Sequence, residues 1–229
     1  MRALMLVPLL CACGRLDFSD PIIDAGPGGD GHRIDGMVVG PGTTGFGETP
    51  TATVTDVTTD TSISSEAGST MNNRGASTSL ECEAAQKRTL LRFDLSALAP
   101  GTPITSATLH LEFGGTTNGM ATISPVLEAW TEGTQIGGAG VANNLQRTTT
   151  ANWTTAGAEA PGSAGASIAS FTIASGANTT TLPTATIQGW VNDGSTNFGV
   201  VIACSGDSTI LAHENAMATS RPELDVTHQ

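Results

Sequence analysis

The sequence predicts an all-β protein, a jelly-roll β-sandwich of about nine short antiparallel strands with one short helix. The first observation is alternation: Ala107, Leu109, Leu111 and Phe113 are separated by polar residues, which is the pattern of a half-buried strand. The second is a break in regular structure, which the Pro and Gly of residues 99–103 (APGTP) predict just before this stretch. The third is composition: only 13% of residues are charged, and Thr, Ser, Gly and Ala dominate, which favours strands and turns over helices.

The same patterns place the individual elements. Strands are expected at residues 52–58, 79–83, 89–95, 105–113, 121–127, 168–173, 199–205, 208–212 and 223–227. A short helix is expected over residues 185–192, because Thr184 can cap it, Ile187 and Trp190 share one face, and Gly194 can end it. Residues 131–166 show no strong strand pattern and predict a long loop, a kind of segment that is often functional.

The N-terminus predicts export. Met1 and Arg2 precede an apolar run that is much shorter than the about 20 residues needed to span a bilayer, but it suits the core of a signal peptide. Residues 10–13 (LCAC) resemble a bacterial lipobox, in which residues 1–12 are removed and Cys13 carries the lipid. We therefore expect a lipoprotein of the outer membrane or cell surface. An ordinary secretory signal is the alternative.

Two further segments follow the signal. Residues 13–50 are rich in Gly, Pro and Asp and predict a disordered tether, and residues 51–229 form a single domain. Removal of residues 1–12 takes away one Arg and no acid, so 8 basic and 21 acidic residues remain, a net charge of -13. This charge argues against nucleic acid as a partner. We expect a monomer.

Several short motifs follow one another along the chain. The longest is residues 90–113 (LLRFDLSALAPGTPITSATLHLEF). The others are DTSI (60–63), NRGASTSL (73–80), AWTEGT (129–134), ANWTTAG (151–157), IQGWVN (187–192), NFGVVI (197–202) and RPELDVT (221–227). In this order they are similar to the DNRLRE domain, also classed as carbohydrate-binding module family 96, with Arg74 in place of the family's aromatic. The resemblance covers residues 53–228 and implies a jelly roll that binds polysaccharide without catalysis.

A sugar site needs an aromatic face and nearby hydrogen-bonding groups, and the chain has no Tyr. Of the three Trp, Trp190 is expected in the core and Trp130 at a strand end, where core packing is the commoner role. Trp153, in the long loop, is the best candidate platform, with loop packing as an open alternative. Arg74 and Glu214 are the candidate polar contacts.

We expect no enzyme, because the chain contains no G-x-S-x-G, H-E-x-x-H, P-loop or G-x-G-x-x-G motif. A polysaccharide-degrading enzyme would need two carboxylates at a defined distance from each other in space, and a sequence does not give that distance. Calcium is the one candidate cofactor, with oxygen donors at Asp60, Asp94, Glu214 and Asp225, but no spacing singles out a metal site. The alternative function is a structural or adhesion module with no defined glycan ligand.

Cys82 and Cys204 are the cysteines that the mature domain keeps besides the lipidated Cys13. Export permits a disulfide between them, and strands distant in sequence can face each other in a sandwich. The alternative is that both are small buried apolar residues.

Overall fold

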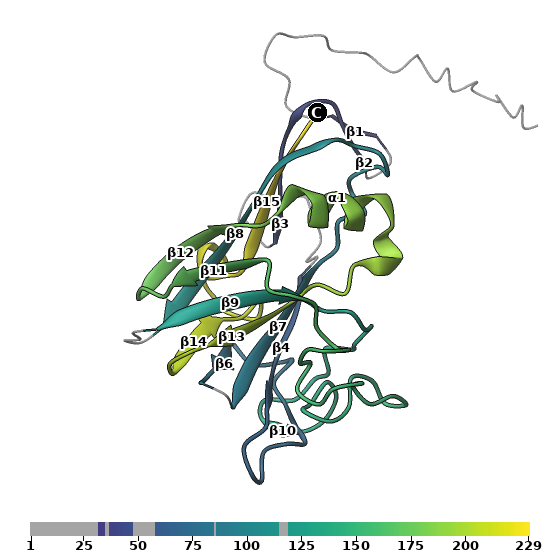
Figure 1. Ribbon diagram of the computed structural model, residues 1–229. Helices are drawn as coiled ribbons and strands as arrows, with labels where there is room; N and C mark the ends of the chain where they lie inside the picture. Colours follow the sequence, from purple (N-terminus) through teal and green to yellow (C-terminus); the bar gives the residue numbers. More distant parts are fainter. Residues whose placement is uncertain (1–31, 35–36, 48–57, 85, 115–118) are drawn as a thin grey trace, which may run out of the picture.

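Two antiparallel sheets form the β-sandwich in the computed structural model, which describes residues 32–34, 37–47, 58–84, 86–114 and 119–229 (Figure 1). The predicted all-β class is confirmed. The five-stranded sheet contains β11 (Ala169–Thr172), β9 (Met120–Pro125), β13 (Val200–Cys204), β7 (Lys87–Phe93) and β4 (Thr58–Ser64), in that order. The six-stranded sheet contains β3 (Gly42–Gly47), β15 (Glu223–His228), β8 (Ile104–Gly114), β14 (Ser208–Leu211) and β6 (Ser79–Cys82), with β12 (Gly176–Thr181) paired to β8.

Smaller elements complete the chain. Two short antiparallel pairs join β1 (His32–Ile34) to β2 (Met37–Val39) and β5 (Asn72–Asn73) to β10 (Gly138–Ala139). The helix α1 (Thr184–Asn192) is followed by the 3-10 turns η1 (Gly194–Thr196) and η2 (Ala218–Ser220). Among the described residues, no helix has both the length and the apolar character that crossing a membrane requires.

The chain passes from one sheet to the other at nearly every step, as in a jelly roll. The run β6, β7, β8, β9 alternates between the six-stranded and the five-stranded sheet, and β13 and β14 do the same. The alternation predicted in β8 is found: Ala107, Leu109, Leu111 and Phe113 are all at most 3% exposed. They belong to the main core between the sheets, together with residues such as Leu91 and Ile202. Burial of each such large apolar side chain stabilises the fold by about 1.5–3 kcal/mol.

A second core covers the other face of the five-stranded sheet. In β7, Leu90 and Leu91 are both buried, at 0% and 1% exposure, although neighbouring strand residues point to opposite faces. Leu90 packs in a separate cluster with Ile63, Trp130 and Trp153. The two Trp belong to the β9–β11 connection (residues 126–168), drawn as coil near β10 in Figure 1. The predicted long loop is therefore a packed cover over the sheet.

The tether prediction is wrong at its C-terminal end. Gly42–Gly47 forms strand β3, which pairs along its whole length with β15, and Phe46 is fully buried. The partner strand lies at the far end of the chain, so local composition did not predict the pairing. Residues 1–31, including Cys13, lie outside the described residues, as do residues 52–57 of the first predicted strand.

The predicted helix is found, but its predicted cap is wrong. Thr184 is the first helical residue, and the N-cap is Pro183, which has no side-chain hydrogen bond to offer. Proline suits this position because its fixed φ leads the chain into the helix. The helix ends at Asn192, and Gly194 begins η1.

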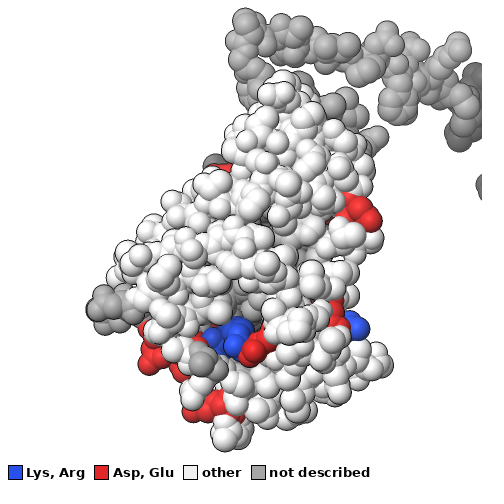
Figure 2. All heavy atoms as spheres, viewed as in Figure 1, with Lys and Arg blue, Asp and Glu red and all other residues white. Residues whose placement is uncertain are grey.

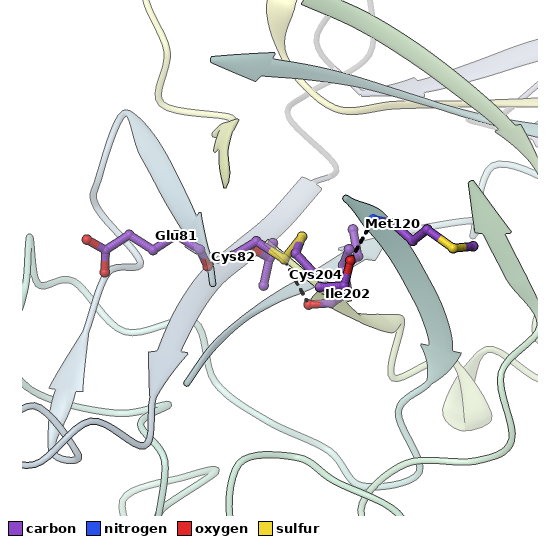
Figure 3. Close-up of a disulfide and its surroundings, with 7 residues drawn as sticks. Glu81, Cys82, Met120, Ile202 and Cys204 are labelled. Carbon is purple, nitrogen blue, oxygen red and sulfur yellow. Dashed lines mark hydrogen bonds between the residues drawn. A yellow bond between two sulfur atoms is a disulfide. The ribbon is translucent and has the colours of Figure 1, made fainter. Parts of the chain in front are cut away.

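The predicted disulfide is confirmed, and it joins the two sheets (Figure 3). Cys82 lies on β6 of one sheet and Cys204 on β13 of the other, with 5.5 Å between their Cα atoms. This distance is ordinary for a disulfide. Both residues are buried at the edge of the main core, at 0% and 6% exposure, so the bond is shielded from solvent reductants.

Candidate metal centre and a polar hollow

Four potential ligands converge where the edge strand β4 meets the end of β14. Asp60 belongs to β4, His213 and Glu214 follow β14, and Glu132 comes from the β9–β11 connection. Each residue offers one ligand atom, and the four atoms lie within 4.8 Å of one another. We call these four residues the carboxylate–histidine cluster. It brings together segments that lie 72 and 153 residues apart in sequence.

Asp60 is the buried centre of this cluster. It pairs with Leu91, a main-core residue, so its side chain points inward between the sheets and is 0% exposed. Its Oδ2 accepts a hydrogen bond from the His213 backbone N–H at 2.8 Å. Its Oδ1 has no hydrogen-bond partner among the described residues. Because β4 is an edge strand, the Asp60 backbone N–H is open to Glu132, whose Oε1 accepts from it at 2.6 Å.

The His213 ring lies between the carboxylates. Its Nδ1 is 3.4 Å from Asp60 Oδ2 and 3.4 Å from Glu132 Oε1, and its Nε2 is 3.2 Å from Glu214 Oε1. The imidazole side chain is 13% exposed, whereas those of Glu132 and Glu214 are 26% and 24% exposed. The cluster is thus closed at Asp60 and open to solvent at the two glutamates.

The pKa values of the cluster reflect an excess of negative charge. Burial lowers the pKa of His213, but the hydrogen bond and charge of Asp60, with the charges of Glu214 and Glu132, outweigh it and raise the pKa to about 9. Burial and the charge of Asp60 raise the pKa of Glu214 to about 7, although the charge of His213 opposes this. His213 and Glu214 therefore hold protons more tightly than isolated side chains would.

Glu132 is held in place by its neighbours. The buried Asn73 side chain donates hydrogen bonds to the Glu132 carbonyl at 2.6 Å and to the Ala142 carbonyl at 2.8 Å. Gly133 follows with φ +81°, and a Cβ there would lie 1.7 Å from the Val141 carbonyl oxygen. Only glycine fits this turn, so the backbone that carries Glu132 has little freedom.

A polar hollow of about 380 Å³ lies beside β4, and two of its lining residues, Thr58 and Thr59, directly precede Asp60 in sequence. Its lining residues are Thr58, Thr59, Arg92, Phe93, Asp94, Gly194 and Asn197. The Arg92 guanidinium lies 5.6 Å from the Trp130 ring centroid and donates to Thr59 Oγ1 at 3.4 Å. Among the described residues, no carboxylate forms an ion pair with Arg92, so its charge is available to a ligand.

The two tryptophans predicted at the sugar site are core residues. Trp153 is 5% exposed and its Nε1 donates to the Asn143 carbonyl at 2.9 Å. Trp130 is 4% exposed and donates to the Phe198 carbonyl at 2.8 Å. With the rings packed and their N–H groups satisfied internally, neither ring offers a face to a sugar, and the platform interpretation of Trp153 is wrong. Trp190 is partly buried against the main core, as expected.

The other predicted site residues are dispersed. Arg74 forms an ion pair with Glu81 at 2.9 Å, away from the hollow's lining. Of the four oxygen donors considered for calcium, Asp60 and Glu214 meet in the cluster, Asp94 lines the hollow, and Asp225 pairs with His110 at 3.1 Å. Glu132 and His213 were not assigned as ligands from sequence. The only signal for them was their place in the short polar motifs AWTEGT and HEN.

Figure 2 shows how charge is distributed on one face. Acidic and basic side chains gather toward the end of the molecule that carries β10 in Figure 1, and the opposite part of this face is almost uncharged. Ion pairs join opposite charges in the described part of the chain, for example Lys87, which lies 2.9 Å from Glu83 and 3.3 Å from Glu81.

Comparison with protein-family models and with curated proteins gives no match. The resemblance to the DNRLRE domain therefore depends on the ordered sequence motifs alone.

Proposed function

We propose that the chain is a non-catalytic polysaccharide-binding module, displayed on the cell envelope as a lipoprotein, and that the polar hollow contacts the sugar. The single observation that carries this proposal is the lining of the hollow, which combines the Arg92 guanidinium, the Asp94 carboxylate and the Thr59 hydroxyl on one side of a β-sandwich. These groups match the donors and acceptors of sugar hydroxyls. The resemblance to a carbohydrate-binding family supports the same function.

The absence of a stacking ring in this lining changes the expected mode of binding. Phe93 is the one aromatic residue among the lining residues and is 6% exposed. Binding would then depend on directional hydrogen bonds and on Arg92, so we expect modest affinity and strong dependence on sugar stereochemistry. A carboxylate on an acidic sugar would pair with Arg92 in bidentate geometry, although the net negative charge of the chain opposes polyanions at longer range.

A glycan array, probed with the exported domain with and without calcium, tests the proposal. We expect binding to a defined set of glycans that falls about tenfold or more in Arg92→Gln and in Asp94→Ala, since each loses a charged hydrogen bond. Arg74→Gln and Asp207→Ala are the matched controls, because both residues lie outside the hollow's lining, and they should bind normally. Equal losses of glycan binding in Arg74→Gln and Arg92→Gln would show that the hollow is not the sugar site.

Lipid anchoring is tested separately. Labelled palmitate should enter the full-length protein, and Cys13→Ser should abolish both labelling and membrane fractionation. Labelling that persists in Cys13→Ser would contradict the lipoprotein assignment.

A structural or adhesion module is the second candidate, and the burial of Trp130 and Trp153 favours it. A sandwich that packs Trp130 and Trp153 inside and is braced by a disulfide between its sheets is suited to mechanical display. Failure to bind any glycan on the array, with a normal melting transition, would support this candidate over the first. A degrading enzyme would instead release reducing ends from a bound polymer, and we expect no release.

A further inference from the structure

We infer that Asp60, Glu132, His213 and Glu214 form a binding site for a divalent transition-metal ion. Each contributes one ligand atom, and the four atoms lie within 4.8 Å of one another. Ligand atoms about 2.1 Å from a shared ion lie about 3 to 4 Å apart. Small rotations of the two partly exposed glutamates would close the present spacing to that value.

The buried carboxylate of Asp60 is the second and independent observation. Its side chain is 0% exposed, and its Oδ1 has no hydrogen-bond partner among the described residues. A charged oxygen in that position is costly unless a cation or a donor meets it. A metal ion coordinated by Asp60 would satisfy this oxygen and offset the repulsion between Asp60, Glu132 and Glu214.

The donor set points to a transition ion in place of calcium, the candidate considered from sequence. Calcium prefers six to eight oxygen ligands, and here one of four ligands is an imidazole nitrogen. Imidazole together with carboxylates suits manganese, iron, cobalt or zinc.

An ion at this position would connect three parts of the fold. Asp60 lies on the edge of the five-stranded sheet, His213 and Glu214 follow a strand of the six-stranded sheet, and Glu132 belongs to the β9–β11 connection. The unfolded chain holds these segments far apart, so the ion would bind the native state selectively and stabilise it. Solvent reaches the site at Glu132 and Glu214, which gives the ion a route of entry.

Manganese is a suitable probe, because it prefers carboxylate ligands, and carboxylates supply three of the four donor atoms here. Metal-stripped protein would be titrated with Mn²⁺ at about pH 8, where competition from protons is reduced, and the free ion followed by electron paramagnetic resonance. We expect one Mn²⁺ bound per chain and a higher melting temperature in its presence.

Variants decide whether the bound ion occupies this cluster. Asp60→Asn and Glu214→Gln should each weaken Mn²⁺ binding by about tenfold or more, with a smaller gain in melting temperature. Asp225→Asn is the matched control, because it also removes a carboxylate that faces a histidine, His110, but lies outside the cluster, and it should bind normally. If Asp60→Asn shows no melting transition, the partly exposed Glu214→Gln and His213→Gln provide the test.

Three results would overturn the inference: no Mn²⁺ binding by the folded protein, unchanged binding in Glu214→Gln and His213→Gln, or tighter binding of Ca²⁺ than of Mn²⁺. The last result would show that the imidazole is not a ligand. None of these measurements depends on glycan binding, so the metal site and the sugar site succeed or fail separately.

Discussion

The two faces of the five-stranded sheet are buried in different ways. The inner face packs against a second regular sheet. The backbone groups of both layers are paired in strand ladders, and a disulfide joins the two layers. The outer face packs against the irregular β9–β11 connection, whose backbone is held by polar side chains such as Asn73 and Asn143 and anchored by Trp130 and Trp153. The inner core should therefore resist single substitutions better than the cover, which depends on a few groups.

The largest expected effect is on the inner core, from removal of the disulfide. The bonded cysteines are 122 residues apart, and the chain-entropy model gives about 5 kcal/mol for closing a loop of that length. The double variant Cys82→Ala/Cys204→Ala should lose most of this free energy of unfolding in urea titration. An unchanged urea midpoint would show that the sandwich does not need the crosslink, and two free thiols in unreduced exported protein would contradict the bond itself.

The next largest effect tests the outer core. Trp153→Ala should reduce the free energy of unfolding by about 3 to 5 kcal/mol, because it empties a buried site and leaves the Asn143 carbonyl without its indole donor. Trp190→Ala is the control, and it should cost less because Trp190 is only partly buried. Limited proteolysis would sharpen the comparison: new cleavage in Trp153→Ala should fall within residues 126–168. A greater loss of unfolding free energy in Trp190→Ala than in Trp153→Ala would contradict the assignment of Trp153 to the second core.

A smaller effect is expected where the cover joins the sandwich. Asn73→Ala leaves the carbonyls of Glu132 and Ala142 without their donor, at a cost of about 1 to 3 kcal/mol. The neighbouring Asn72→Ala is the control, because no side-chain hydrogen bond of Asn72 is found among the described residues. Because Asn73 positions Glu132, Mn²⁺ affinity should fall in Asn73→Ala and not in Asn72→Ala. Normal Mn²⁺ affinity in both variants would show that Asn73 does not position Glu132 for the cluster.

The smallest expected effect is a pH dependence confined to the cover. Burial raises the pKa of Glu128, but hydrogen bonds from Ser163 and Thr154 and the charge of Arg147 outweigh it, so the pKa lies below 4.5. A lowered folded pKa contributes stability that is present above the unfolded value and lost as pH falls through the folded one. Glu128→Gln should therefore cost about 1 kcal/mol near neutral pH and nothing at strongly acidic pH. The same pH profile in the control Glu112→Gln would show that Glu128 is not responsible.

The sequence predicts the regular part of this fold much better than the irregular part. The placement of β8 and β15 follows from side-chain alternation, and that of β7 and β13 from short apolar runs, both of which are local properties. Strand β3 has a Gly- and Thr-rich sequence, and it forms because β15 supplies a partner ladder. The burial of Trp153 depends on how residues 126–168 fold over the sheet, and no periodic pattern encodes that path.

The candidate site shows the same limit. Asp60 and Glu214 were identified as oxygen donors from sequence, but neither could be assigned to a common site with Glu132 and His213. Their meeting depends on the edge position of β4 and on the turn after β14, both products of sheet topology. The disulfide could be predicted only because residues 51–229 contain two cysteines to pair.

The carboxylate–histidine cluster lies at the junction of the two regions, with Asp60 and His213 from the sandwich and Glu132 from the cover. The most direct test of this metal site is a crystal structure of protein grown with Mn²⁺, with an anomalous difference map that locates the ion. We expect a single strong peak about 2.1 Å from ligand atoms of Asp60, Glu132, His213 and Glu214. A map with no peak at these residues, or with the ion bound elsewhere on the domain, would contradict it.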